Sequence, residues 1–475
     1  MQSKKGKRKK IIVLIIFAMC SFTFLDNAES GISIVSDPKA SSLEKLAVGE
    51  LQNYIQKISG KEVNITSDIS DKMKSTDTII CIGNITKESL ITQILKTNSM
   101  AMPPEKIKNN GFFIKTTNHG NKEYLLLGSD TDLGVVYSAY HFLEKYCHIG
   151  FFEDGDYVPE AEDFSIRRIG KIDLITSPRF VNREMLQPCS TFYTSIYWGL
   201  SEYKQELDWI LKKKFSLVGG LTHRGDMKVL KNIMDRYGVK DGPPVKWQET
   251  PEWIDWDYAE TKRILSYARL RGLKVIAPAL HNSGEVDVTF MNKFPDAKYF
   301  TTEWGGIYKL VFLNPADPLF IKYGADWVKE VVRLYGTDHY YEIGPYPELE
   351  VGNTPEEKVQ IKTDYGKNTA EYIRTADPQG TWIMSGWGLA DRFIWPEDVS
   401  RKFLTAIPDD VYIINDIWAD YYHMYKRLNY FWGKNWGFSI IHFFGGNTSM
   451  RGDVPLTIKK AKEVASDPKA KNCVN

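Results

Sequence analysis

The segments Trp382-Ile-Met-Ser-Gly-Trp387 and Tyr412-Ile-Ile-Asn-Asp-Ile417 decide the fold that we predict for this chain. Each is a short apolar run that ends in small or polar residues, which is typical of a parallel strand buried on both faces. A helical pattern at Pro396–Leu404 separates the two runs. The order of strand, loop and helix indicates a parallel α/β sheet.

The same unit is repeated seven times from Phe180 onward. The other predicted strands are Phe180–Met185, Ser216–Leu221, Lys274–Leu280, Asp338–Ile343 and Phe438–Phe444, and the other helical stretches are Ser201–Lys214, Tyr258–Arg271, Leu319–Leu334 and Pro355–Thr375. Seven units predict a (β/α)8 TIM-type barrel over residues 166–475, although a closed barrel needs an eighth strand. An open doubly wound sheet is disfavoured because no glycine-rich phosphate loop follows the first strand.

A small α+β domain is predicted before the barrel, over residues 31–165. Its strands are Gly31–Ser36, Thr78–Ile82, Phe112–Lys115 and Tyr124–Leu127, and its helices are Leu43–Ile58 and Leu133–Tyr146. The apolar residues of the first helix recur at helical spacing, and Gly60 follows as a helix stop.

The charge of the chain and its N-terminal sequence indicate which partners and which cellular location to expect. The 475 residues carry 61 Lys and Arg against 60 Asp and Glu, and six of the positive charges lie between Lys4 and Lys10. Nucleic acid is therefore not an expected partner. Residues 1–30 read as a signal peptide, because the apolar run Ile11–Phe24 is shorter than the roughly 20 residues of a membrane span. We expect a secreted or periplasmic protein without a stable membrane span; the alternatives are an N-terminal anchor and a lipoprotein modified at Cys20.

The cysteines and histidines indicate neither a metal nor a cofactor. Cys81, Cys147, Cys189 and Cys473 are far apart without C-x-x-C spacing, although two of them could pair in an oxidising compartment. His223 and His281 have no second ligand two or four residues away, so structural or hydrogen-bonding roles are favoured.

The residues that follow the predicted strands should meet at one rim of the barrel, where its chemistry belongs. They are Gln187-Pro-Cys189, Thr222-His-Arg224, His281-Asn-Ser283, Glu348, Trp387, Asn415-Asp416 and Phe443-Phe-Gly-Gly-Asn447. A carboxyl group among amides, imidazoles and aromatic rings suits a sugar-cleaving site, which usually uses two carboxyl groups.

Each candidate has an ordinary structural alternative. Glu348 follows a buried strand in a proline-flanked loop, which favours an acid role, whereas a loop Glu by itself is usually a solvated group. Trp387 either stacks on a sugar or caps the barrel interior, and Trp304 reads as a loop residue with a binding role. Asp416 is either a second carboxylate or a buried partner of a neighbouring group.

Several motifs in this order resemble the alpha-N-acetylglucosaminidases, the NAGLU-like enzymes of glycoside hydrolase family 89. They are Tyr335-Gly-Thr-Asp-His339, Glu348, Trp382-Ile-Met-Ser-Gly-Trp387 and His442-Phe-Phe-Gly-Gly-Asn447, within a resemblance over roughly residues 31–470. The resemblance implies a retaining exo-hydrolase that removes terminal alpha-linked N-acetylglucosamine from glycans. It also implies that Glu348 is the general acid/base. The implied substrate-binding residues are Gln187, Cys189, Trp304, Trp387, Asp416, Ile417, Phe444 and Asn447.

The chain departs from the family pattern at two places. The residue before the acid is often Asn in the family, and here it is Pro347. The family's nucleophile comes from the eighth strand, in a segment just beyond Asn475, and a helical domain follows. We therefore expect this chain to lack the last strand and the nucleophile. A non-catalytic glycan-binding protein and an exo-glycosidase of other specificity are the alternatives.

The expected missing nucleophile gives a direct test. Residues 31–475 alone should release little or no nitrophenol from a nitrophenyl alpha-N-acetylglucosaminide, because no covalent glycosyl intermediate can form without the second carboxylate. Robust turnover by this fragment would contradict the prediction.

Overall fold

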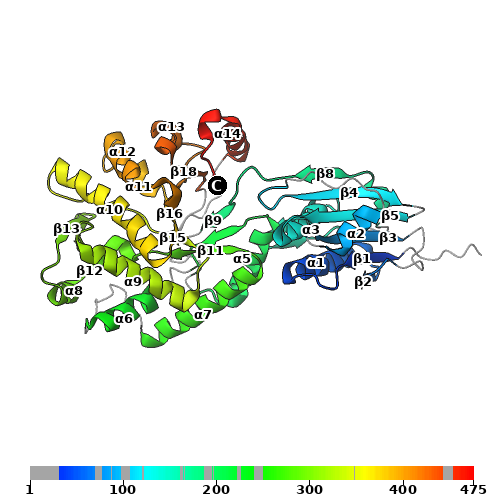
Figure 1. The fold of residues 1–475 in the computed structure, drawn as a ribbon, viewed down its shortest axis with the longest axis horizontal. Coiled ribbons are helices and arrows are strands. Elements are labelled where there is room, and N and C mark those ends of the chain that lie inside the picture. The colour runs from blue at the N-terminus through cyan, green and yellow to red at the C-terminus, as the bar shows by residue number, and fades with distance from the viewer. Residues whose placement is uncertain are drawn as a thin grey trace, which may run out of the picture.

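The computed structural model describes residues 31–69, 77–86, 88–97, 107–119, 122–160, 164, 166–186, 195, 197–221, 226–239, 250–346, 348–441 and 453–474. They form two units that lie side by side, a small α/β unit and a larger barrel (Figure 1). Among the helices of these residues, none combines the length and the apolar character that crossing a membrane requires.

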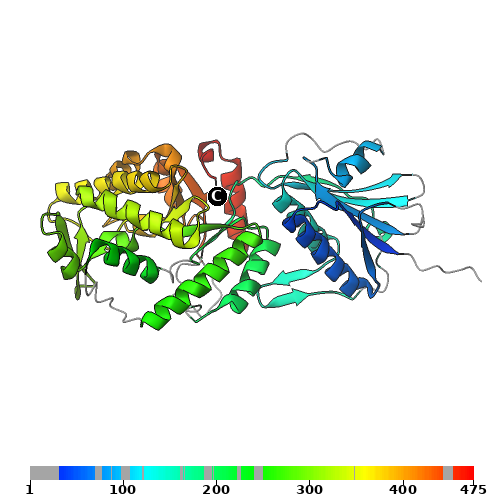
Figure 2. The ribbon, with the colours of Figure 1, turned by 60° about the horizontal axis from the view of Figure 1, so that its bottom comes forward.

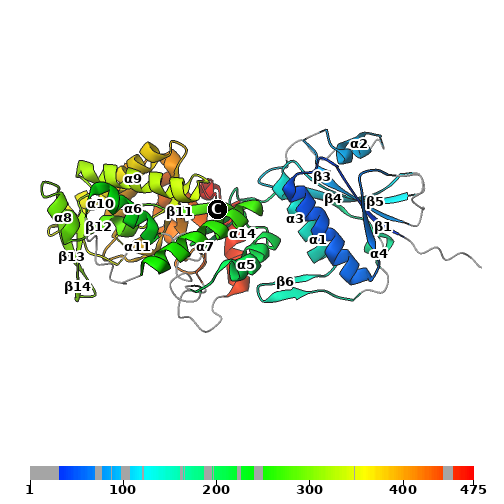
Figure 3. The same ribbon diagram turned by 90° about the horizontal axis from the view of Figure 1, so that it is seen from below.

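The N-terminal unit is a six-stranded sheet in the order β2-β1-β3-β5-β4-β8. The strands are β1 (Ile32–Ser36), β2 (Val63–Thr66), β3 (Thr78–Asn84), β4 (Phe112–His119), β5 (Lys122–Ser129) and β8 (Asp173–Thr176). Helices α1 (Ser42–Ser59) and α3 (Asp132–Lys145) cover one face, and α2 (Leu90–Thr97) covers the other (Figure 3). Since β8 pairs with β4, this unit extends past residue 165, and the predicted boundary lies too early.

The barrel contains the seven predicted strands in chain order, each hydrogen-bonded in parallel to the next. They are β9 (Glu184–Leu186), β10 (Leu217–Gly219), β11 (Lys274–Pro278), β15 (Tyr340–Glu342), β16 (Thr381–Ser385), β17 (Tyr412–Asp416) and β18 (Asn435–Phe438). This confirms the TIM-type α/β class. The last of them begins three residues before the predicted Phe438–Phe444, because Trp436 is the fully buried residue of this strand.

Helices surround this sheet. The long ones are α5 (Leu200–Lys212), α6 (Asp226–Tyr237), α7 (Pro251–Leu270), α9 (Pro318–Tyr335), α10 (Pro355–Ala376), α12 (Glu397–Ala406) and α14 (Val454–Ser466). Five of them match predicted helical stretches, whereas α6 and α14 were not predicted. Thr250, Asp317, Thr354 and Asp453 each cap a helix that begins with proline at its first or second position.

Residues 472–474 lie at the eighth-strand position. Cys473 forms a parallel bridge with Trp436 of β18, and the Val474 N–H donates to the Trp436 carbonyl at 2.8 Å. The Asn182 N–H, just before β9, donates to the Val474 carbonyl at 3.3 Å. These contacts occupy the edge of β18 and the backbone just before β9.

An antiparallel insertion between β11 and α9 was missed by the sequence analysis. It consists of β12 (Glu285–Val286), α8 (Val288–Lys293), β13 (Tyr299–Trp304) and β14 (Tyr308–Leu313). Trp304 is the last residue of β13 rather than a loop residue, because Gly305 and Gly306, both at positive φ, make the tight turn of a hairpin.

The N-terminal unit packs on the end of the barrel where the strands begin. The Tyr137 hydroxyl of α3 donates to the Phe215 carbonyl, just before β10, at 2.6 Å. Leu43 of α1 reaches Gly272, just before β11, so closely that a Cβ there would lie 2.9 Å from its methyl carbon. The hairpin of β6 (Gly150–Phe152) and β7 (Gly155–Tyr157) extends this contact to α5, where Lys212 pairs with Asp156 at 2.6 Å (Figure 2). The opposite rim is left free of this unit.

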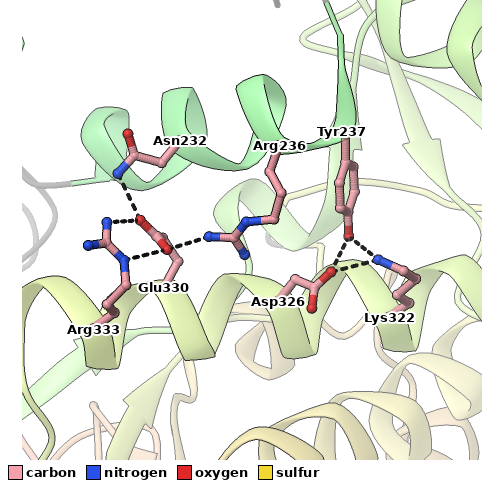
Figure 4. A network of polar contacts seen from close by, with 7 residues as sticks. All are labelled: Asn232, Arg236, Tyr237, Lys322, Asp326, Glu330 and Arg333. Atoms are coloured by element: carbon pink, nitrogen blue, oxygen red, sulfur yellow. Dashed lines mark hydrogen bonds and ion pairs between the residues drawn. The ribbon is translucent and has the colours of Figure 1, made fainter.

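A polar network fixes α6 on α9 (Figure 4). Glu330 of α9 accepts hydrogen bonds from Asn232 at 2.7 Å, from Arg236 at 2.6 Å and from Arg333 of its own helix. These donors, Arg333 foremost, lower the pKa of Glu330 to about 2. The network holds α6, the helix that follows β10, against α9.

We predict that Glu330→Gln lowers the free energy of unfolding by about 2 kcal/mol at neutral pH, since its 1% exposed side chain no longer neutralises two half-exposed arginines. The native carboxyl has a depressed pKa, so its contribution is complete above the ordinary carboxyl value and is lost as the pH falls toward 2. Urea unfolding at pH 7 and pH 3 measures both effects.

Asp235→Asn on α6 is the matched control, because its ion pair with Lys231 is exposed. It should cost less than about 0.5 kcal/mol at either pH. Equal effects of the two variants would contradict the role given to Glu330.

Candidate active site

Glu348 and two tryptophans meet at the rim formed by the carboxyl ends of the strands. The Trp387 Nε1–H donates to Glu348 Oε1 at 3.0 Å, and the Trp304 Nε1–H lies 3.3 Å from Oε2. The three residues come from the loop after β15, from the start of α11 (Trp387–Ala390) after β16, and from the end of β13. Residues up to 83 positions apart are thus brought together around one carboxyl group that remains exposed.

The loop that carries Glu348 has an unusual backbone. Tyr346 and Glu348 have φ values of 44° and 61°, in the left-handed region that residues other than glycine rarely adopt. Such a conformation persists only where neighbouring contacts hold it. Here the Tyr346 ring is fully buried, edge-on to Phe300 and Phe312 of the insertion.

Hydrogen bonds fix the start of the same loop. The Ser283 and Tyr365 hydroxyls donate to the Gly344 carbonyl at 2.7 and 3.1 Å, and the Trp382 indole donates to the Ile343 carbonyl at 2.9 Å. The position of Glu348 is therefore set by packing and hydrogen bonds from the insertion, α10 and β16 together.

More aromatic rings extend from this carboxyl group. Trp418, just after β17, has its ring centroid 5.0 Å from that of Trp387, and Tyr422 lies 5.3 Å from Trp418. On the hairpin side, Tyr308 stacks on the half-exposed Trp304 at 5.8 Å. Sequence reasoning missed Trp418 and Tyr308, although the position of Trp418 two residues after a strand end was a usable signal.

Asp416 holds a loop in place. Its fully buried carboxylate accepts the Tyr425 N–H at 2.7 Å and the Trp418 N–H at 3.3 Å. Burial raises the pKa of Asp416 to about 7. Of the two roles considered for it, the structure fits the buried partner. Ile417 beside it is also buried.

Inside the barrel, a layer of polar side chains lies two residues further along the strands than a layer of apolar side chains. The apolar layer consists of Leu217, Ile276, Ile383 and Ile413. Tyr340 and Val474 pack against this layer. Since strand side chains alternate, Glu342, Ser385 and Asn415 face the same interior two residues further along. The Asn415 amide donates across the barrel to Glu184 of β9, with both carboxylate oxygens at 3.0 Å. Glu184 was missed because it lies within a predicted strand, whereas only residues that follow the strands were considered.

The other predicted site residues cannot be placed. Gln187, Cys189, Phe444 and Asn447 lie outside the described residues, as do Thr222, His223 and Arg224. In the described part of the chain, no group of three or more His, Cys, Asp or Glu side chains is arranged to hold a metal ion. The described cysteines, Cys81, Cys147 and Cys473, are buried thiols.

Two family models match this chain. Residues 245–474 match the family model "Alpha-N-acetylglucosaminidase (NAGLU) tim-barrel domain", and residues 25–142 match "Glycosyl hydrolase family 67 N-terminus". Over residues 245–474 the chain is therefore NAGLU-like. It is 23% identical over 293 residues to the human alpha-N-acetylglucosaminidase, which covers 56% of this chain and 38% of the human protein.

Solved structures share the fold. A family 89 glycoside hydrolase from Clostridium perfringens, in complex with 2-acetamido-1,2-dideoxynojirmycin, matches 85% of this chain and 43% of its own with a TM-score of 0.60 and 16% identity. CpGH89 from the same organism, in complex with its substrate GlcNAc-alpha-1,4-galactose, matches 86% and 43% with a TM-score of 0.59 and 15% identity. The NAGLU-like chain thus spans less than half the length of these relatives.

The burial of Asp416 gives a pH-dependent prediction. Its pKa is raised in the folded state, so between about pH 4 and pH 7 the folded protein keeps a proton that the unfolded chain has lost. This group therefore stabilises the fold in acid, and its contribution falls as the pH rises to 7, by at most about 1.4 kcal/mol per pH unit.

Asp416→Asn removes this titration. The unfolding free energies of the original protein and of this variant are measured with urea from pH 4 to pH 8. The value for the original protein minus the value for the variant should fall with rising pH and then level off. Parallel profiles for the two proteins would refute the buried protonated carboxyl.

Proposed function

We propose that this NAGLU-like protein is an exo-acting glycoside hydrolase that removes terminal alpha-linked N-acetylglucosamine from glycans with retention of configuration, with Glu348 as its general acid/base. The observation that supports this most is the exposed Glu348 carboxyl group, held between two indoles at the rim of a TIM-type barrel.

The two indoles orient the carboxyl group of Glu348. Both ring nitrogens only donate hydrogen bonds, so neither can accept a proton from Glu348. In the proposed first step Glu348 gives its proton to the glycosidic oxygen of the leaving group, and the two contacts fix the orientation of the carboxyl group. After the first step the same group, now ionised, activates the water that completes hydrolysis.

A retaining mechanism needs a second carboxylate about 5 Å from the first. Asp416 does not suit this role, since its oxygens hold two backbone N–H groups. We assign the nucleophile to the eighth strand, as the family resemblance implies. The parallel bridge between Cys473 and Trp436 supports this assignment, because it directs residues 472–474 toward the rim that carries Glu348.

The substrate assignment follows from the aromatic rings and the relatives. Trp304 and Trp387 offer flat faces beside the acid, and sugar rings bind such faces through their C–H groups. A Clostridium perfringens relative is described with GlcNAc-alpha-1,4-galactose as its substrate. We assign Gln187, Cys189, Ile417, Phe444 and Asn447 to the same sugar pocket, with Asp416 as a positioning residue, and we propose an exported protein on the basis of residues 1–30.

The acid role is tested with Glu348→Gln in the intact protein. Hydrolysis of GlcNAc-alpha-1,4-galactose should fall by about 100-fold or more, since its leaving group needs protonation. For a nitrophenyl glycoside, kcat/KM should fall much less, because nitrophenolate leaves without a proton, whereas kcat should also fall because the second step loses its base. Rates for both substrates are measured by product release.

Glu350→Gln is the control, since Glu350 lies in the same loop, is exposed and pairs with Lys358 at 2.6 Å. It should leave both rates nearly unchanged. A Glu348→Gln variant with unaltered rates would remove the acid role. Tight binding of the disaccharide by the original protein without any hydrolysis would favour the non-catalytic glycan-binding alternative.

A further inference from the structure

A continuous row of aromatic rings leads away from Glu348 toward solvent. It begins with Trp387, which donates to the carboxyl group, and continues through Trp418, Tyr422 and Tyr421. Successive ring centroids lie 5.0, 5.3 and 5.0 Å apart. We call these four residues the aromatic track.

The outer end of the aromatic track is unusually exposed. Tyr421 and Tyr422 have exposed fractions of 69% and 58%. A single exposed tyrosine on a protein surface needs no explanation, but neighbouring large rings in contact with a candidate site often mark a binding surface. Tyrosine also combines a flat apolar face with a hydroxyl group, which suits the mixed surface of a sugar.

Hydrogen bonds hold the loop that carries Trp418, Tyr421 and Tyr422. The N–H groups of Tyr421, Tyr422 and His423 all donate to the Trp418 carbonyl, at 3.1, 2.9 and 3.2 Å. Asp416 accepts the N–H groups at the two ends of the loop, from Trp418 and Tyr425.

Two contacts join this loop to its neighbours. Trp418 forms an antiparallel bridge with Ile440, and the Thr457 hydroxyl of α14 donates to Asp420 at 2.9 Å. The rings are therefore held in place before any ligand arrives, which reduces the ordering cost of binding.

We propose that the aromatic track binds the leaving-group side of an oligosaccharide, so that Tyr421 and Tyr422 hold sugars beyond the one directly attached to the terminal N-acetylglucosamine. This rests on the proposed function of Glu348. A general acid protonates the glycosidic oxygen, and the remainder of the glycan leaves from that oxygen. A row of rings that starts at the acid and runs outward to solvent therefore follows the leaving glycan, and the exposed tyrosines set a preference for longer substrates.

The test compares two substrates in the intact protein carrying Tyr421→Ala and Tyr422→Ala together. One substrate is a nitrophenyl alpha-N-acetylglucosaminide, and the other is an oligosaccharide with the same terminal sugar on at least three further sugars. For the oligosaccharide, kcat/KM should fall by about tenfold or more, mainly through KM, since two stacking contacts are lost. The nitrophenyl substrate, which does not reach the tyrosines, should react at an almost unchanged rate.

Two control variants separate stacking from other effects. Tyr157→Ala removes an exposed tyrosine from β7 of the N-terminal unit, and both substrates should react as before. Tyr421→Phe with Tyr422→Phe keeps both rings and should retain most of the oligosaccharide activity.

An unchanged oligosaccharide kcat/KM in the double alanine variant would overturn the proposal. So would a change in self-association, measured by light scattering, without a change in oligosaccharide kinetics, since the tyrosines would then serve protein contact. If the original protein hydrolyses neither substrate, calorimetric binding of the oligosaccharide decides: binding that depends on the tyrosines supports the aromatic track although the proposed function fails, and absence of binding overturns both.

Discussion

The site depends on the parallel pairing of the barrel strands. Because β11, β15, β16 and β17 all run in the same direction, the segments that follow them end at one rim. Without this constraint, Trp304, Glu348 and Trp387 would have no reason to meet, since they lie in the segments after three different barrel strands, β11, β15 and β16. The N-terminal unit packs at the opposite end, against residues that precede β10 and β11, so it supports the barrel without covering this rim.

Two buried side chains fix the loops that carry Glu348 and Trp418 at this rim. Tyr346 packs edge-on against Phe300 and Phe312 and holds a left-handed backbone that presents Glu348. Asp416 does the same for the loop of Trp418 through two backbone N–H groups. Both groups are fully buried, while the residues that they position face solvent. Stability and function are thus divided between neighbouring residues: the buried residue supplies the packing or the hydrogen bonds, and its neighbour lies at the rim.

The sequence predicted the barrel well for a physical reason. Strands such as Trp382–Ser385 are buried on both faces and therefore appear as unbroken apolar runs, whose order already indicates parallel pairing. It did not predict the hairpin of β13 and β14, because buried and exposed residues follow no regular alternation there and the two strands pair with each other outside the barrel sheet. Contacts across the barrel, such as Asn415 with Glu184, join residues 231 positions apart and leave no local pattern in the sequence.

The interior of the barrel also explains why its rim can be polar. The apolar layer of Leu217, Ile276, Ile383 and Ile413 fills the barrel near the strand beginnings and supplies its hydrophobic core. The layer above it carries Asn415 bonded to Glu184, which satisfies both side chains away from bulk water. Because apolar side chains fill the barrel interior near the strand beginnings, the interior near the strand ends can hold carboxyl and amide groups beneath Glu348. This separation places the chemistry at the carboxyl rim of the strands and the contacts with the N-terminal unit at the other end.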